Sequence, residues 1–200
     1  MGEHNRVRII AGRWRGRKLT FPDRPGLRPT PDRVRETLFN WLQPVVAGAR
    51  CLDLFAGSGA LGWEALSRGA VEVVMVDSDS QVVRNLKEHS KQLAPRGVTV
   101  LQSSALDYLH GPAKPFDIVF LDPPFRQGLL ADTIHRLESG GWLAPRAWIY
   151  MESETGLQEL LLPAGWKMSR SKNAGQVSYN LAERQPTPSE TGSHTEQSPE

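Results

Sequence analysis

The sequence predicts an α/β domain built on a mainly parallel sheet with helices on both faces. Apolar runs of strand length alternate with periodic helical segments between residues 51 and 151. These runs are apolar almost throughout, which is typical of strands covered on both sides. The first run leads into a glycine-rich turn and a helical pattern, residues 52–62, Leu-Asp-Leu-Phe-Ala-Gly-Ser-Gly-Ala-Leu-Gly. A strand, tight turn and helix of this kind open the nucleotide-type α/β domains.

A basic β-hairpin arm is predicted for residues 1–28, ahead of this domain. Val7, Ile9 and Ile10 form one short apolar run, and Leu19 and Phe21 are placed to pair with it. The segment between the two runs holds glycines and cations, as expected for a turn at the surface.

The positive charge of the chain is concentrated at its N-terminal end. Residues 1–50 carry 11 Lys and Arg against 4 Asp and Glu, whereas the remaining 150 residues carry 13 against 18. A basic segment on a mildly acidic domain suggests a polyanionic partner. The arm residues that could bind phosphates, or stack on a base in the case of the tryptophan, are Arg13, Trp14, Arg15, Arg17 and Lys18. The alternative is a solvated arm with Trp14 packed on the domain.

The next segment, residues 29–46, predicts an amphipathic helix that packs on the core. Thr30 is expected to cap it, Pro31 suits the first helical position and Asp32 faces the positive end of the helix. Its apolar residues recur at helical spacing: Val34, Leu38, Trp41, Leu42 and Val45. The cations that remain available near its start are Arg28, Arg33 and Arg35.

The main domain, residues 29–184, continues with alternating elements. Strands are predicted at 51–55, 71–76, 98–101, 116–121 and 147–151, with a closing strand pair at 166–169 and 177–181. Helices are predicted at 60–68, 80–93 and 129–137, with a short helical turn at 105–109 and a weak helical segment at 155–162. Asp79 is expected to cap the helix that begins at Ser80. Residues 185–200 are rich in Pro, Ser, Thr, Glu and Gln, which predicts a disordered tail.

Several functional classes are disfavoured by composition. No apolar stretch approaches the roughly 18–20 residues of a membrane span, and the N-terminus lacks the apolar segment of a secretory signal. Cys51 is the single cysteine, so an internal disulfide is impossible. The five histidines are scattered without metal-ligand spacing. We therefore expect a cytoplasmic protein that binds neither membrane nor metal.

The glycine loop has two interpretations. Its spacing is that of Gly-x-Gly-x-x-Gly, and Asp77 follows Gly57 by 20 residues, as in dinucleotide-binding proteins. Asp53, however, lies near the same strand end and would repel a pyrophosphate bound at the helix N-terminus. It would suit a cofactor with positive groups and no phosphate, such as S-adenosylmethionine, with Asp77 accepting hydrogen bonds from ribose hydroxyls. The alternative for Asp53 is an acid with a local hydrogen bond only.

A second motif follows the strand at 116–121: Asp122, Pro123, Pro124 and Phe125. Ligands of open α/β sheets bind beyond the carboxyl ends of such strands. The two prolines fix φ and stiffen the turn, which suits a site that holds an amino group at a set angle. The Asp122 carboxylate and the Pro123 carbonyl could accept both hydrogens of an exocyclic amine, with Phe125 against the ring. Such a site acts by positioning and electrostatics. The alternative is a rigid turn without chemistry.

These motifs together resemble a known family. The pattern Asp-x-Phe-x-Gly-x-Gly with a downstream Asp-Pro-Pro-Phe resembles that of class I, S-adenosylmethionine-dependent amino methyltransferases. The closer resemblance, over residues 6–184, is to the ribosomal RNA small subunit methyltransferase D family, guanine-N2 methyltransferases of 16S rRNA. It rests on segments 8–19, 28–42, 52–70, 122–126 and 175–179. The first two segments are the more specific, because many methyltransferases share the others.

The resemblance implies a Rossmann-like fold, whose seven-stranded sheet has an antiparallel last strand, with an N-terminal hairpin extension. The implied cofactor-binding residues are Asp53, Phe55, Ala56, Gly57, Gly59, Asp77, Ser78, Ser104 and Ala105. At Ser104 the chain departs from the acid that class I enzymes often use for the adenine amine; the serine hydroxyl, backbone groups or Asp107 could replace it. The residues that could border the target base are Arg28, Thr30 and Arg33, for which capping and surface charge are equal alternatives.

The expected activity is methyl transfer from S-adenosylmethionine to the N2 amine of one guanine in 16S rRNA. The base must be unstacked to reach the pocket. The expected partner is rRNA within the small subunit or its assembly intermediate, bound by a monomer. Three rivals are a DNA adenine-N6 methyltransferase, an NAD-dependent oxidoreductase and a non-enzymatic RNA-binding assembly factor.

Overall fold

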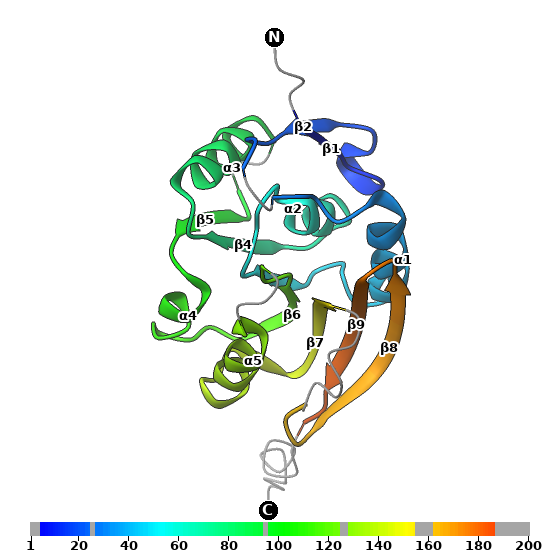
Figure 1. The fold of residues 1–200 in the computed structure, drawn as a ribbon, viewed down its shortest axis with the longest axis vertical. Coiled ribbons are helices and arrows are strands. Elements are labelled where there is room, and N and C mark those ends of the chain that lie inside the picture. The colour runs from blue at the N-terminus through cyan, green and yellow to red at the C-terminus, as the bar shows by residue number, and fades with distance from the viewer. Residues whose placement is uncertain (1–4, 25–26, 94–95, 125–127, 155–161, 187–200) are drawn as a thin grey trace, which may run out of the picture.

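The computed structural model describes residues 5–24, 27–93, 96–124, 128–154 and 162–186. Phe125, most of the weak helical segment at 155–162 and most of the predicted tail lie outside these residues. The fold class is the predicted one, an α/β domain with one seven-stranded sheet (Figure 1).

The sheet has the strand order β5-β4-β3-β6-β7-β9-β8. The five parallel strands are β3 (Arg50–Asp53), β4 (Glu72–Asp77), β5 (Val98–Gln102), β6 (Phe116–Leu121) and β7 (Leu143–Glu154). The closing pair is β8 (Trp166–Ala174) and β9 (Val177–Arg184), and β9 is antiparallel to both of its neighbours. The antiparallel strand implied by the family resemblance is therefore confirmed.

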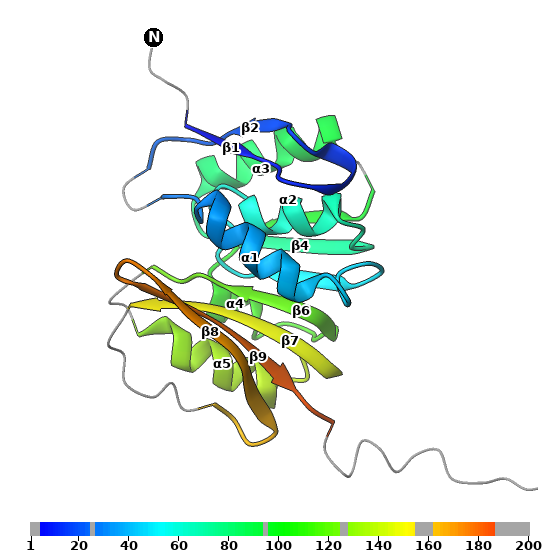
Figure 2. The same ribbon diagram turned by 90° about the vertical axis from the view of Figure 1, so that its right-hand side faces the viewer.

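Helices cover both faces of the sheet (Figure 2). One face packs against α1 (Asp32–Leu42), α2 (Ala60–Ser67) and α3 (Ser80–Leu93), and the other against α4 (Ala105–Tyr108) and α5 (Leu129–Ser139). Each face has its own apolar cluster, because successive side chains of a strand point to opposite sides. No helix within the described ranges is long and apolar enough to cross a membrane.

The β7–β9–β8 ladder is longer than the sequence pattern predicts. β8 continues to Ala174, five residues past the predicted end, although most of its side chains are exposed. Polar, exposed strands lack the apolar signal on which prediction depends. Pairing with β9, from Trp166 opposite Arg184 to Ala174 opposite Val177, holds this strand in place.

Helix α1 begins later than predicted, and the predicted cap is wrong. Pro31 occupies the N-cap position, and no side chain caps the helix. The Thr30 hydroxyl instead donates to Glu152 Oε1 at 3.1 Å, inside the protein. The cap expected for α3 is confirmed, since Asp79 Oδ1 accepts from the backbone N–H of Gln81 at 2.7 Å.

The predicted N-terminal hairpin is present and docked on the domain. β1 (Arg6–Arg8) pairs antiparallel with β2 (Lys18–Thr20), and a 3-10 turn, η1 (Gly12–Trp14), lies between them. The hairpin lies over α2 and α3 in Figure 2. Its apolar side chains, Val7 and Leu19 among them, are buried in the core cluster of that face. The arm is therefore part of the packed structure.

Candidate active site at the carboxyl edge of the sheet

The strand order reverses between β3 and β6, and ligands of open α/β sheets bind at this switch point. Asp53 ends β3, Asp77 ends the neighbouring β4, and Asp122 directly follows β6. The topology thus brings the two motifs singled out in the sequence, 70 residues apart, to one edge of the sheet.

The glycine loop requires its glycines. Gly57 and Gly59 have φ of 50° and 75°, a region that other residues rarely adopt. A side chain on Gly59, the N-cap of α2, would also place its Cβ 2.5 Å from Trp63 Nε1. The Gly57 N–H donates to Asp77 Oδ2 at 2.8 Å. This bond fixes the loop against the end of β4, beside the position proposed for a ribose.

Asp53 occupies the N-terminal end of α2. The side chain is buried, at 2% exposure, and its Oδ2 accepts from the Gly62 N–H at 3.2 Å, in the first turn of the helix. A dinucleotide site places a pyrophosphate at such a helix end. Here a carboxylate is already present, so the dinucleotide interpretation is disfavoured. Burial, with a smaller contribution from the charge of Asp77, raises the pKa of Asp53 to about 7.

Beyond β5, Ser104 and Asp107 form one polar pair. The Ser104 Oγ accepts from the Asp107 N–H at 3.1 Å and donates to Asp107 Oδ2 at 2.6 Å, which caps α4. The Ser104 hydroxyl proton is therefore already used, and Asp107 keeps acceptor capacity at an exposed position. Ser103 N–H donates to the Asp77 carbonyl at 3.0 Å, which ties this corner to the end of β4.

Asp122 is half-buried, Pro123 is buried and Pro124 is exposed. The pKa of Asp122 is raised well above its usual range, first by burial and then by the negative charges of Glu152 and Asp53. The two charge contributions mean that Asp122 lies within electrostatic reach of both carboxyl groups. Phe125, the fourth residue of the motif, lies outside the described residues.

Glu152 is a site residue that the sequence reasoning missed. β6 and β7 pair in parallel with Leu121 opposite Met151, so the next residues, Asp122 and Glu152, are neighbours at the edge. Glu152 is 6% exposed, and burial raises its pKa. The available signal was an acidic residue directly after the apolar run of a predicted parallel strand.

The segment between the hairpin and α1 crosses this edge. Arg24 Nε donates to Asp79 Oδ2 at 2.7 Å, and Thr30 contacts Glu152. Leu27 lies against the glycine loop, since a Cβ added to Gly57 would come within 2.8 Å of Leu27 Cδ1. The N-terminal segment therefore contacts the β4 end, the glycine loop and the β7 end. No local sequence pattern indicates these long-range contacts.

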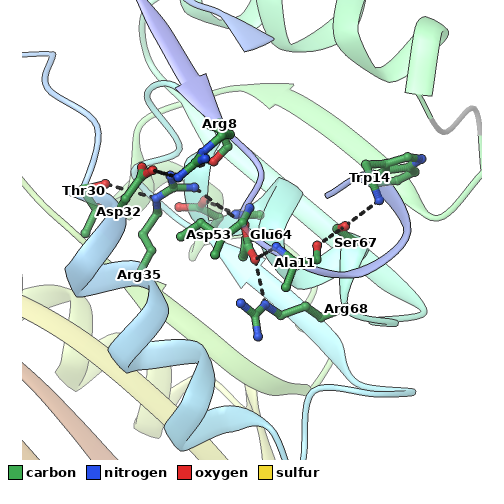
Figure 3. Close-up of polar contacts among 12 residues, drawn as sticks. Arg8, Ala11, Trp14, Thr30, Asp32, Arg35, Asp53, Glu64, Ser67 and Arg68 are labelled. Carbon is green, nitrogen blue, oxygen red and sulfur yellow. Dashed lines mark hydrogen bonds and ion pairs between the residues drawn. The ribbon is translucent and has the colours of Figure 1, made fainter. Parts of the chain in front are cut away.

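A buried ion pair fastens the hairpin to the domain (Figure 3). Glu64 of α2 is fully buried and accepts from the backbone N–H groups of Ile10 at 2.8 Å and Ala11 at 3.0 Å. Arg35 Nη1 lies 3.7 Å from Glu64 Oε2, and Arg68 Nε donates to Glu64 Oε1 at 2.7 Å. The prediction that Arg35 is available to bind phosphate is wrong: it is 1% exposed, because its guanidinium pairs with Asp32 and lies against Glu64 inside the protein.

The other predicted RNA-binding cations are at the surface. Exposed side chains include Arg13, Arg15, Arg17, Lys18, Arg28 and Arg33. Trp14 is half-buried and meets Trp63 edge-on, with ring centroids 6.5 Å apart. The backbone N–H of Trp14 donates to Ser67 Oγ at 3.0 Å. Trp14 thus anchors the hairpin turn. Thr30 is buried and bonded to Glu152, which places it nearer the carboxylates than the surface.

The residues present fit S-adenosylmethionine. Burial raises the pKa of Asp53, so the part of the site beside the glycine loop favours a ligand that brings positive charge. The ammonium and sulfonium groups of S-adenosylmethionine would do so. Within the described ranges no group of His, Cys, Asp and Glu is arranged to hold a metal ion.

Asp53→Asn is expected to raise the melting temperature of the cofactor-free protein, more at pH 8 than at pH 5.5. The folded-state pKa of about 7 lies above the ordinary value of 3.8 for an aspartate, so stability is lost as pH rises between these values and stays low above them. Asparagine avoids this cost and keeps an oxygen for the Gly62 N–H. Thermal melts at both pH values test this; a larger gain at pH 5.5 would contradict it. The same variant should bind S-adenosylmethionine more weakly by calorimetry.

Comparison with known proteins gives a consistent result. A family model described as "Conserved hypothetical protein 95" matches residues 7–183. The ribosomal RNA small subunit methyltransferase D of Escherichia coli (strain K12) is 53% identical over 179 residues, which cover 90% of each chain. That of Haemophilus influenzae is 48% identical, covering 88% of this chain and 92% of its own.

Solved structures agree with this. yhhF from Escherichia coli, described as a candidate methyltransferase, superposes with a TM-score of 0.86 at 49% identity, covering 92% of this chain and all of that one. A candidate methylase from Haemophilus influenzae gives 0.79 at 44% identity, covering 90% and 99%.

Proposed function

Because this chain belongs to the ribosomal RNA small subunit methyltransferase D family, we propose that it methylates the N2 amine of one guanine in small-subunit (16S) rRNA. The chain is a methyltransferase with the Rossmann-like class I fold. The observation that carries the proposal is the Asp122-Pro123 turn beside Asp53 and Glu152 at the switch point of the sheet.

The cofactor would be held along the ends of β3, β4 and β5. Asp53 and the loop at Gly57 and Gly59 would receive the methionine part, and Asp77 with Ser78 the ribose. The Ser104–Asp107 pair, next to Ala105, offers acceptors for the adenine amine. Phe55 and Ala56, between Asp53 and the first glycine, complete the lining. S-adenosylmethionine, when bound, supplies an electrophilic methyl group on its sulfonium.

The target amine would be held at the end of β6. The Asp122 carboxylate and the Pro123 carbonyl accept its two hydrogens, with Phe125 against the base. An aromatic amine is a poor nucleophile because its lone pair is delocalised into the ring. Two fixed acceptors orient that lone pair and stabilise the positive charge that develops on nitrogen. The proton then leaves toward Asp122, whose raised pKa suits it to receive one.

The hairpin would bind the rRNA backbone. Its exposed cations, with Arg28 and Arg33 at the start of α1, form a basic surface carried by the docked hairpin. We propose that the chain acts as a monomer on the small subunit or its precursor, in the cytoplasm. Trp14 remains a candidate for contact with a base.

Arg15→Ala with Arg17→Ala is expected to weaken rRNA binding and to lower the slope of log K against log salt by about 1.5, since each lost phosphate contact lowers it by roughly 0.7–0.9. A charge-matched control is Lys114→Ala with Lys167→Ala, exposed cations that lie before β6 and on β8, outside the hairpin. Filter binding at several salt concentrations measures both. Equal effects from the two pairs would contradict a specific role for the hairpin.

The substrate can be tested in cells with and without the gene. Nucleosides from small-subunit rRNA and from DNA are compared by mass spectrometry. Cells without the gene should lose one N2-methylguanosine per small-subunit rRNA, and their DNA should be unchanged. Reverse transcription then maps the position. A loss of N6-methyladenine from DNA would favour the rival methyltransferase, and no change in either would favour a non-enzymatic assembly factor.

A further inference from the structure

Glu152 continues a row of acidic side chains on one face of the sheet. Side chains of a strand alternate between faces, and paired residues of neighbouring strands share a face. Asp53 pairs with Phe120 and Tyr150 also pairs with Phe120. All three therefore lie on the face covered by α1, α2 and α3. Two residues further along, Asp122 and Glu152 return to this face, side by side at the edge.

The contacts of Glu152 fix which of its oxygens faces the site. The hydroxyls of Thr30, at 3.1 Å, and Tyr150, at 2.8 Å, both donate to Oε1. In the described part of the chain no bond ends on Oε2. Glu152 is 6% exposed and lies next to Asp122, so Oε2 is the oxygen left for a ligand at this edge of the sheet.

The edges of the bases differ beside their exocyclic amines. In guanine the N2 amine is next to N1–H, a donor. In adenine the N6 amine is next to N1, an acceptor, and in cytosine the N4 amine is next to N3, also an acceptor. A carboxylate beside the amine-binding acceptors is complementary to guanine alone and repels a ring nitrogen lone pair.

We infer that Glu152 is a specificity-determining residue that accepts the N1–H of the target guanine through Oε2. Asp122 and Pro123 hold the N2 amine, and Glu152 reads the donor next to it. Thr30 and Tyr150 keep Oε1 occupied and so direct Oε2 to the base. This inference rests on the proposed function, whose amine site it extends by one contact.

A base analogue in place of the target guanine tests this inference. Small subunits are reconstituted with rRNA that carries guanine or 2-aminopurine at the mapped position. 2-Aminopurine keeps the N2 amine but has an acceptor at N1. The wild-type chain should methylate guanine about 30-fold faster, since a mismatched base-edge contact costs roughly 1–3 kcal/mol. Equal rates on the two bases would overturn the inference, and absence of N2 methylation on guanine would overturn the proposed function itself.

Glu152→Gln supplies the complementary half of the test. The Thr30 and Tyr150 hydroxyls would still donate to Oε1, so the amide nitrogen takes the position of Oε2 and becomes a donor. This variant should lose activity on guanine and gain on 2-aminopurine, reducing the preference at least tenfold. The matched control, Glu72→Gln at the opposite edge, should keep the wild-type preference. A Glu152→Gln variant slowed equally on both bases would show a structural role only; if it fails to fold, the wild-type comparison of the two bases decides.

Discussion

Asp122→Ala will lower the rate of methyl transfer by about 10²–10³-fold or more, the usual effect of removing a group that stabilises the transition state. Asp122 is the carboxylate of the Asp-Pro-Pro turn, and we propose that it holds the target amine and receives its proton. The proposed cofactor contacts, at Asp53, Asp77 and the glycine loop, are made without it. Binding of S-adenosylmethionine should therefore change little.

Single-turnover methylation of small subunits measures the first effect, and calorimetry with S-adenosylmethionine the second. Asp117→Ala is a matched control, because Asp117 is on the same strand but at its other end, where Oδ2 accepts from the Arg50 N–H at 2.8 Å. The control should retain the wild-type rate. Near wild-type turnover by Asp122→Ala would refute the role given to this carboxylate.

Glu64→Gln will destabilise the protein by about 3–5 kcal/mol, because it removes the fully buried carboxylate that pairs with Arg68 at 2.7 Å and lies 3.7 Å from the buried Arg35 guanidinium. The two oxygens of Glu64 accept separately from the N–H groups of Ile10 and Ala11. A glutamine has one oxygen, so one N–H would face an amide NH₂. The hairpin should loosen, with faster proteolysis near its turn and weaker rRNA binding.

Urea unfolding measures this loss. The control is Glu72→Gln, which removes a half-exposed ion pair with Arg50 and should cost about 1 kcal/mol or less. If both variants lose the same small amount, the buried pair does not fasten the hairpin. Intact rRNA binding by a strongly destabilised Glu64→Gln would separate hairpin docking from RNA binding.

The strands and helices that carry the site could be predicted because their patterns are local. The apolar run that ends at Asp53 and the glycines after it are consecutive in the sequence. Their meeting with Asp122 could also be predicted, since the carboxyl ends of parallel strands share one edge. The position of Asp53 at the helix end, which disfavours a pyrophosphate, agrees with the sequence interpretation.

The contacts that cross the fold could not be predicted. Arg33 and Arg35 are two positions apart, and no local pattern distinguishes them. Arg35 is nevertheless buried against Glu64, whereas Arg33 is exposed. Thr30 is a residue type that commonly caps helices. Its hydroxyl instead donates to Glu152, which is 122 residues away in the sequence. Such pairs depend on how α1, α2 and β7 pack, which no local pattern encodes.

We propose above all that this chain methylates the N2 amine of one small-subunit guanine. The direct measurement is incubation of the purified chain with small subunits from cells that lack the gene and with isotope-labelled S-adenosylmethionine. Nucleoside mass spectrometry then identifies the labelled product. One labelled N2-methylguanosine per subunit is expected with the wild-type chain, and none with Asp122→Ala. Label on another atom or base, or equal label with Asp122→Ala, would contradict it.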